Sequence, residues 1–183
     1  MSYLPSKPKH SLVHILLDHP ALTRAQIAYV EEVMRGDSPF SALDRETVFA
    51  FCSGLNNCGF CETSHTITVE ILGGEKGLVR DLVDDPNLIN APENLRPVLA
   101  YARKLTLRPS SVGQTDIDAI LEAGWSETAL VHLANVVGLA NLFNRIVEGL
   151  GVPNDPDMVA MGGKMMAEDG YMPIIERLKE PAE

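Results

Sequence analysis

Residues 44–73 read DRETVFAFCSGLNNCGFCETSHTITVEILG, and this stretch carries the strongest indications of both fold and chemistry. It begins inside a predicted helix over residues 42–53, for which Ser41 is the expected N-cap and Asp44 the acid three residues later. A second helix is predicted over residues 58–72, because glycines end the first helix before it and close the second one after it. The stretch therefore predicts two consecutive helices joined by a short turn.

The second helix carries a cysteine pair, Cys58 and Cys61, and then His65 four residues after the pair. Asn56 and Asn57, just before the pair, offer caps for the start of this helix. At about 3.6 residues per turn the three side chains line one helix face, with both cysteines in the first turn. Free amide donors and the positive end of the helix dipole stabilise a thiolate there, and thiolate is the reactive species toward peroxides and disulfides.

A proton acceptor and a group to orient it are both available near the cysteine pair. His65 lies one turn after Cys61 and can take the proton of a thiol when a third group orients the imidazole ring. Glu46, on the preceding helix and twelve residues before Cys58, is the candidate for that third group. A helical hairpin can place its carboxylate beside the ring, directly or through a water, and so form a proton relay. The predicted catalytic residues are Cys61, Cys58, His65 and Glu46.

The residues by themselves leave other interpretations of the cysteines open. Cys52, Cys58 and Cys61 are the three cysteines of the chain and lie within ten residues, which structural disulfides would not explain. With His65 they could supply four ligands to zinc, although the spacing from Cys52 is unusual for such sites. Cys52 is otherwise expected to be a small buried apolar residue, and the pair could belong to an inert structural scaffold.

The rest of the chain also predicts helices. No segment combines sustained period-two alternation with the composition of a strand, and the connecting segments are short. Further helices are expected over residues 22–35, 75–83, 92–107, 115–123, 127–150 and 157–166, with a turn around 173–178. We therefore expect one all-α domain over residues 1–183, with an extended N-terminal arm at 1–14 and a C-terminal helical extension at 156–183.

The helix predicted at 127–150 is apolar almost all round. Such a helix is usually buried, which favours either a central position in the bundle or an oligomer interface. Four polar residues interrupt it, Asn135, Asn141, Asn144 and Arg145, and these are expected to cap or pair locally rather than to line an active-site pocket.

Composition and charge narrow the classes of partner. The 183 residues carry a formal net charge of −10, and such a chain repels phosphate backbones and lacks the basic face of a membrane-surface helix. No apolar stretch is expected to be long enough to span a bilayer, and residues 1–10, MSYLPSKPKH, lack the apolar core of a signal peptide. We therefore expect a cytoplasmic protein with no nucleic-acid or membrane partner.

The combined spacing E-x₁₁-C-x-x-C-x₃-H, which residues 46–65 form, resembles the alkylhydroperoxidase D group of the carboxymuconolactone decarboxylase superfamily. The run NLFNR at residues 141–145, followed by 147–152, is similar to the branch called peroxidase-related proteins, and so is the stretch 81–108. The resemblance covers roughly residues 15–155, and the combined spacing is far more specific than C-x-x-C by itself.

This resemblance implies an all-α helical bundle of the alkylhydroperoxidase D type that assembles into dimers, trimers or hexamers. It implies that Cys61 attacks the hydroperoxide and becomes a sulfenic acid, and that Cys58 donates a proton and then closes a Cys58–Cys61 disulfide. His65 and Glu46 would relay the proton that activates the pair. A dithiol protein or a small thiol would reset the enzyme by exchange, and neither a cofactor nor a metal is implied.

The sequence departs from the best-known members of this group at one position. They carry a histidine directly before the second cysteine, where this chain has Phe60, so the relay has one fewer titratable group. The decarboxylase branch lacks the cysteine pair, which argues against lactone decarboxylation. The leading hypothesis is a thiol-dependent peroxidase that reduces hydroperoxides. The alternatives are a zinc-binding or structural scaffold, and a small-molecule lyase or isomerase on the same fold.

Overall fold

The computed structural model describes residues 2–7 and 11–178, and within these the regular structure is helical, with no strand. The elements are α1 (Leu12–Leu17), α2 (Pro20–Arg35), α3 (Ala42–Leu55), α4 (Gly59–Ile71), α5 (Leu78–Asp84), α6 (Arg96–Leu107), the 3₁₀ turn η1 (Pro109–Ser111), α7 (Gln114–Glu122), α8 (Glu127–Leu150), α9 (Pro156–Asp169) and α10 (Pro173–Arg177). The predicted all-α fold is confirmed.

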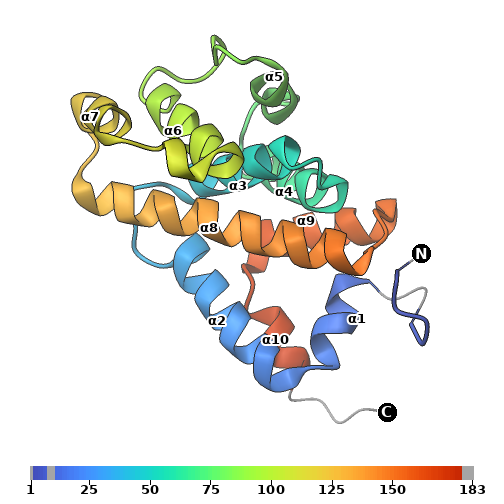
Figure 1. The fold of residues 1–183 in the computed structure, drawn as a ribbon. Helices are drawn as coiled ribbons and strands as arrows, with labels where there is room; N and C mark the ends of the chain where they lie inside the picture. Colours follow the sequence, from blue (N-terminus) through green and yellow to red (C-terminus); the bar gives the residue numbers. More distant parts are fainter. Residues whose placement is uncertain (1, 8–10, 179–183) are drawn as a thin grey trace.

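Helix α3 lies at the centre of this arrangement. It packs against α4, α5, α6 and α8, and every residue on it from Arg45 to Gly54 is buried. Figure 1 shows α8 crossing the molecule, with α5, α6 and α7 on one side and α1, α2 and α10 on the other. Helix α4, which carries the second cysteine, packs against both α3 and α9, so residues distant in sequence converge around it.

The start of α3 follows the prediction, whereas the turn after it does not. Ser41 and Asp44 form a capping box, with Asp44 N–H donating to Ser41 Oγ at 3.1 Å. Asn56 is the C-cap of α3 and Asn57 has a positive φ of 54°, so neither caps the following helix as predicted. Asparagine tolerates the left-handed region, and it reverses the chain here. Cys58 is therefore the N-cap of α4 rather than a residue of its first turn.

The N-terminal segment also differs from the predicted arm at 1–14. Helix α1 begins inside that range, at Leu12, and it buries Ile15 and Leu16. Its few apolar residues are too short a run to show helical periodicity, and they gain their burial from contact with α2. Residues 1 and 8–10 of the predicted arm lie outside the described residues.

Two further boundaries bear on the predictions. Helix α6 begins at Arg96 rather than at residue 92, because Pro97 occupies its first turn and Pro92 precedes it in a turn. The described part of the segment 156–183 contains α9, which is longer than the helix expected at 157–166, and α10, which is a short helix where a turn is expected. Residues 179–183 lie outside the described part of the chain.

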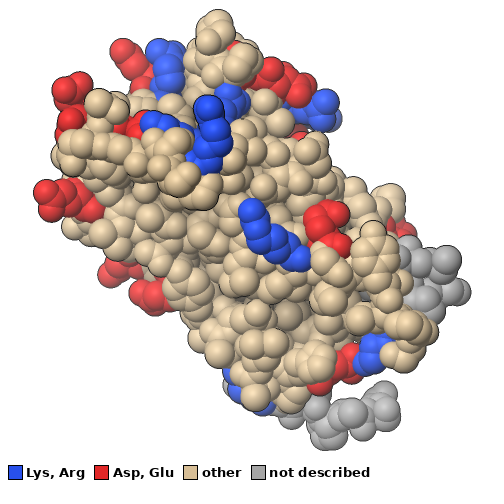
Figure 2. All heavy atoms as spheres, in the orientation of Figure 1, with Lys and Arg blue, Asp and Glu red and all other residues tan. Residues whose placement is uncertain are grey.

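Helix α8 is long and apolar enough, by length and composition, to cross a membrane, so the prediction that no stretch reaches this length is wrong. Half of its most apolar window, 50%, is buried within the protein, as in a helix that packs in a core. Its outer face exposes Val131 and Leu142. Figure 2 shows a largely uncharged surface across the middle of this view, where Figure 1 places α8.

Candidate active site

The four predicted site residues come from the hairpin of α3 and α4 and are all buried. Glu46 lies on α3, Cys61 and His65 lie on α4, and Cys58 caps α4. Glu46 and Cys58 are 0% exposed, Cys61 is 3% exposed and His65 is 6% exposed. Such burial is unusual for a carboxylate, and it requires partners that compensate for lost hydration.

Glu46 and His65 are in direct contact. His65 Nδ1 lies 2.6 Å from Glu46 Oε2, and the imidazole ring stacks on Phe49 with 3.7 Å between centroids. A carboxylate can only accept, so Nδ1 carries the hydrogen and donates it to Glu46. In the neutral ring Nε2 then carries the lone pair, which is the form needed to accept a proton. The helical hairpin thus brings the predicted base and its orienting carboxylate together.

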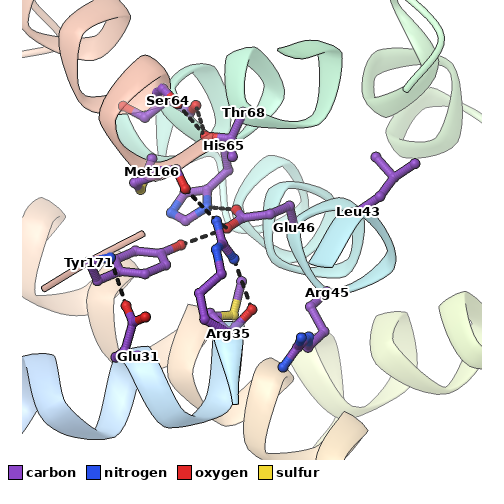
Figure 3. A network of polar contacts seen from close by, with 12 residues as sticks. Glu31, Arg35, Leu43, Arg45, Glu46, Ser64, His65, Thr68, Met166 and Tyr171 are labelled. Carbon is purple, nitrogen blue, oxygen red and sulfur yellow. Dashed lines mark hydrogen bonds and ion pairs between the residues drawn. The ribbon is translucent and has the colours of Figure 1, made fainter. Parts of the chain in front are cut away.

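Two residues that the sequence did not indicate complete the surroundings of Glu46, as Figure 3 shows. Arg35 Nη2 donates to Glu46 Oε1 at 2.7 Å, and the hydroxyl of Tyr171 donates to the same oxygen at 2.8 Å. Arg35 Nη2 also donates to the carbonyl of Met166 at 2.6 Å. Helix α2 and the junction between α9 and α10 therefore both hold the carboxylate in place.

These contacts determine the ionisation of the network. Burial by itself would raise the pKa of Glu46, but the contacts with His65 and Arg35 outweigh it and leave this pKa below its ordinary value. Burial, followed by the charge of Glu46, raises the pKa of Tyr171 well above its ordinary value. Tyr171 therefore stays a neutral hydrogen-bond donor to an ionised Glu46.

The thiol pair is reduced in the structure, and Cys58 and Cys61 are both free. The hydrogen bond with Cys58 favours the protonated form of Cys61 and, with burial, raises the pKa of the Cys61 thiol well above its ordinary value. The helix start is expected to stabilise a thiolate at this pair, but the pKa of Cys61 shifts in the opposite direction. A hydrogen bond from Asn144 acts the opposite way and lowers this pKa. Asn144 also donates to Ser53 Oγ at 2.9 Å, which holds its amide beside the pair.

Cys52 takes no part in the pair. It is 0% exposed, and burial raises the pKa of its thiol to about 12, so it behaves as the predicted buried apolar residue. In the described part of the chain, no group of three or more His, Cys, Asp or Glu side chains is arranged to hold a metal ion. The zinc alternative therefore has no donor set among these residues.

A cavity of about 120 Å³ opens beside Cys61 and His65. Cys58 is not among the residues that line it, so Cys61 is the accessible member of the pair. Helix α9, which packs against α4, contributes a largely methionine wall: Met158, Met161, Gly162, Met165 and Met166. Leu, Ile, Val and Phe side chains from the other helices make up most of the rest. The cavity is thus mostly apolar, with Ser64 and His65 on the same helix as Cys61 and with Ser11, Tyr171 and Arg177 as its other polar lining residues.

Three residues of this site carry no motif signal in the sequence: Arg35, Ser64 and Tyr171. Asn144 lies in the run at 141–145 that carries the resemblance, but no catalytic role is predicted for it. The expectation that Asn144 caps or pairs locally is wrong, because its amide donates to Ser53 Oγ on α3, accepts from Asn56 and also contacts Cys61. The Tyr171–Glu46 hydrogen bond spans 125 positions of sequence, so only the tertiary fold shows it.

Comparison with known proteins identifies the fold. An uncharacterized peroxidase-related protein from Silicibacter sp. TM1040 superimposes with a TM-score of 0.75 at 23% identity, covering 80% of this chain and 76% of that one. The alkylhydroperoxidase AhpD core of an uncharacterized peroxidase-related protein from Ralstonia eutropha JMP134 gives a TM-score of 0.74 at 22% identity, with 81% and 78% covered. No protein-family model and no curated protein sequence matches the chain. At these identities the likeness establishes a helical fold of the alkylhydroperoxidase D type.

Proposed function

We propose that this protein is a thiol-dependent peroxidase that reduces hydroperoxides through Cys58 and Cys61, with His65 and Glu46 as its proton relay. One observation carries the proposal. Cys61 and His65 line the same cavity, while Glu46 Oε2 holds the imidazole at its Nδ1 edge, at 2.6 Å. A nucleophile, a base and a group that orients the base are the parts that thiol catalysis requires.

In the first half-reaction the relay activates the accessible thiol. His65 Nε2 takes the proton of Cys61, and the thiolate attacks the terminal, hydroxyl-bearing oxygen of the hydroperoxide. The sulfur–oxygen bond forms while the oxygen–oxygen bond breaks, and the departing alkoxide receives the proton held by His65. Cys61 is oxidised to a sulfenic acid, and the substrate leaves as an alcohol.

In the second half-reaction the pair closes. The sulfur of Cys58 attacks Cys61, a disulfide forms, and the sulfenic oxygen leaves as water after taking the proton of the Cys58 thiol. An external dithiol then reduces the disulfide by exchange and restores both thiols with its two electrons and two protons. We expect this donor to be a dithiol protein or a small thiol.

The raised pKa of Cys61 explains why an internal base is needed. A thiol that keeps its proton at rest reacts slowly unless the proton is removed as substrate binds. Phe60 stands where the best-known members of the resembling group have a histidine, and a phenylalanine side chain cannot act as this base. Among the described residues that line the cavity, His65 is the side chain whose ring nitrogen offers a lone pair to a thiol proton.

The lining of the cavity favours an organic hydroperoxide over hydrogen peroxide. An apolar wall gains free energy by contact with an alkyl or aromatic group, and about 120 Å³ accommodates a compact one. Methionine side chains adapt to irregular shapes, which suits a wall that binds a range of such groups. The substrate class is therefore a compact apolar hydroperoxide.

Assembly and location belong to the same proposal. We expect a homo-oligomer, a dimer, trimer or hexamer, in which the apolar outer face of α8 around Val131 and Leu142 is covered by another copy. We expect a cytoplasmic location, because a reducing compartment keeps supplying the thiols that the cycle consumes. Sedimentation of wild type beside Val131→Glu tests the assembly, since a charge on a covered face would dissociate it.

The decisive experiment is stopped-flow reaction of the reduced protein with tert-butyl hydroperoxide, followed by mass analysis of the peptide that contains both cysteines. We expect rapid peroxide loss with loss of two hydrogen atoms from the Cys58–Cys61 peptide. Cys61→Ser should abolish the reaction, whereas Cys58→Ser should stop at a sulfenic acid that a dimedone probe captures. Cys52→Ala is the matched control and should react as wild type does.

Unaltered peroxide and intact thiols in wild type would refute the proposal. An activity that survives replacement of both Cys58 and Cys61 by serine would indicate instead a lyase or isomerase on this fold.

Substrate size can be tested at one wall position. Gly162 lines the cavity, and a Cβ there meets no atom within 4 Å, so Gly162→Leu extends into open space. We expect this variant to react about tenfold more slowly with cumene hydroperoxide and normally with hydrogen peroxide. Gly113→Leu is the control, because Gly113 has equal room, precedes α7 and is not among the residues that line the cavity. Equal slowing with both peroxides would argue against an organic group bound in this cavity.

A further inference from the structure

Ser64 presents an unpaired hydroxyl beside the reactive thiol. It lies between Cys61 and His65 on α4, is 4% exposed, and lines the cavity with both of them. Its Oγ has no hydrogen-bond partner among the residues that the structure describes. Buried hydroxyls are generally paired, and leaving one unpaired costs stability, so this exception calls for an explanation.

Neighbouring hydroxyls show that pairing within these helices is readily available. On α3, Thr47 Oγ1 donates to the carbonyl of Leu43 at 2.8 Å, and Ser53 Oγ donates to that of Phe49 at 2.9 Å. On α4, Thr68 Oγ1 donates to the carbonyl of Ser64 at 3.0 Å. Each uses the carbonyl four residues earlier, as serine and threonine commonly do in helices. The Ser64 hydroxyl makes no such bond, so its donor is not committed to any residue that the structure describes.

We propose that the Ser64 hydroxyl binds the substrate, donating a hydrogen bond to the peroxide oxygen that leaves when Cys61 attacks. The proposal rests on the peroxidase function and names a further binding group of the same site. Ser64 is three residues after Cys61, which places the two side chains on neighbouring positions of one helix face. An apolar cavity that holds an apolar group needs one such polar contact to fix the orientation of the oxygen pair.

The chemistry gives this hydrogen bond its effect on rate. As the oxygen–oxygen bond breaks, negative charge develops on the leaving oxygen, and a fixed donor in a water-poor cavity stabilises that charge. The proton that the oxygen finally takes comes from His65, and Ser64 keeps its own. The contact therefore strengthens toward the transition state, so its loss lowers the rate of the chemical step.

The test variant is Ser64→Ala, measured by stopped flow in the reduced full-length protein. We expect its rate constant with tert-butyl hydroperoxide to fall by about 10–100-fold. With peracetic acid the loss should be much smaller, because a carboxylate leaving group needs little help from a donor. Thiol alkylation with iodoacetamide across pH should match wild type, because the hydroxyl does not act through the ionisation of Cys61.

Thermal unfolding separates this role from a structural one. Ser64→Ala removes an unpaired buried hydroxyl, so we expect its melting temperature to rise by about 2–4 °C while its reaction slows. Thr23→Val is the matched control, because Thr23 is buried, outside the cavity lining, and donates to the carbonyl of Leu16 at 2.5 Å. It should melt at a lower temperature and keep the wild-type rate constant.

The outcomes distinguish this inference from the proposed function. If wild type consumes tert-butyl hydroperoxide and Ser64→Ala reacts equally fast, the role of Ser64 is overturned and the peroxidase function stands. An equal loss with both peroxides would also overturn it, since the donor would then not act on the leaving oxygen. Wild type that fails to react with either peroxide would overturn the peroxidase function and, with it, the assignment of Ser64.

Discussion

Glu46→Gln changes one atom at the centre of the site, and its consequences follow from the three donors that surround the carboxylate. His65 Nδ1, Arg35 Nη2 and the Tyr171 hydroxyl lie within 2.6–2.8 Å of its two oxygens. The glutamine carbonyl can still accept from Arg35 and Tyr171. Its amide then faces His65 with a donor, and the ring must respond by accepting at Nδ1 and carrying its hydrogen on Nε2. That tautomer cannot take the proton of Cys61.

The magnitudes can be worked out from this geometry. A base held in the wrong tautomer costs up to about 10⁴-fold in rate, by analogy with a serine protease whose orienting aspartate is replaced by asparagine. Breaking a buried ion pair costs about 3–5 kcal/mol. We expect about 3 kcal/mol for Glu46→Gln, because the Arg35 side chain keeps 16% of its surface exposed and regains some hydration. This corresponds to a fall of about 6–12 °C in melting temperature.

The pKa of Glu46 also predicts how the stability difference between wild type and Glu46→Gln changes with pH. The pKa of Glu46 in the folded protein lies below its ordinary value of 4.5, so the ionised network stabilises the fold at neutral pH. This contribution is fully present above the unfolded-state pKa and is lost as pH falls from there through the folded pKa. Glu46→Gln lacks this titration, so the difference in free energy of unfolding between the two proteins should shrink below about pH 4.5.

Urea denaturation followed by circular dichroism, repeated from neutral to acidic pH, measures the stability difference. Stopped-flow reaction with tert-butyl hydroperoxide measures the rate. Glu122→Gln is the control, because Glu122 is exposed on α7 and the same change of charge there should affect neither quantity. If Glu46→Gln matches wild type in stability and rate at neutral pH, then the carboxylate neither holds the network together nor orients the base.

Four further outcomes follow from individual residues. Tyr171→Phe removes one hydrogen-bond donor to the ionised Glu46 and should lower the free energy of unfolding, measured by urea titration, by about 1.5–3 kcal/mol. A change below about 0.5 kcal/mol would show that this hydrogen bond does not stabilise the fold. Cys52 should resist iodoacetamide in the native protein at mildly alkaline pH and react only in urea, because the pKa of its thiol is raised to about 12; peptide mass analysis would reveal any contrary labelling. Gly162→Ala should stabilise the protein by about 1 kcal/mol. Gly163→Ala should destabilise it in the same urea assay, because its Cβ would lie 2.7 Å from the Ser64 carbonyl oxygen.

The helices were predictable where periodicity and capping chemistry agree. The capping box at Ser41 and Asp44 and the whole of Glu127–Leu150 are found as expected, because these signals are local in sequence. The same local signals were misleading between the two central helices. Two asparagines suit either a helix N-cap or the left-handed position after a helix, and Asn57 adopts the second. That choice depends on how α4 packs against α3 and is not encoded in the turn.

The site residues also divide into those that the sequence could predict and those that it could not. Glu46, Cys58, Cys61 and His65 were predictable because a helical hairpin turns their spacing into proximity. Tyr171 and Arg35 were not, because no periodicity relates α2 or the α9–α10 junction to α3. The ionisation of Cys61 was also unpredictable: a helix start favours a thiolate, but burial and the bond with Cys58 act more strongly in the opposite direction.

The segment after residue 155 was expected to be an extension beyond the resemblance to known proteins, yet its described part completes the site. Helix α9 forms the methionine wall, Gly163 lets α9 approach α4 closely, and Tyr171 reaches the carboxylate. By burying the thiol, this packing contributes to the raised pKa of Cys61, and by enclosing His65 it keeps the relay away from bulk water. A thiol that is protonated at rest resists chance alkylation and oxidation, and it becomes reactive only when a ligand fills the cavity beside its base. On the proposed function, selectivity for an apolar hydroperoxide and protection of the resting thiol thus have one structural cause.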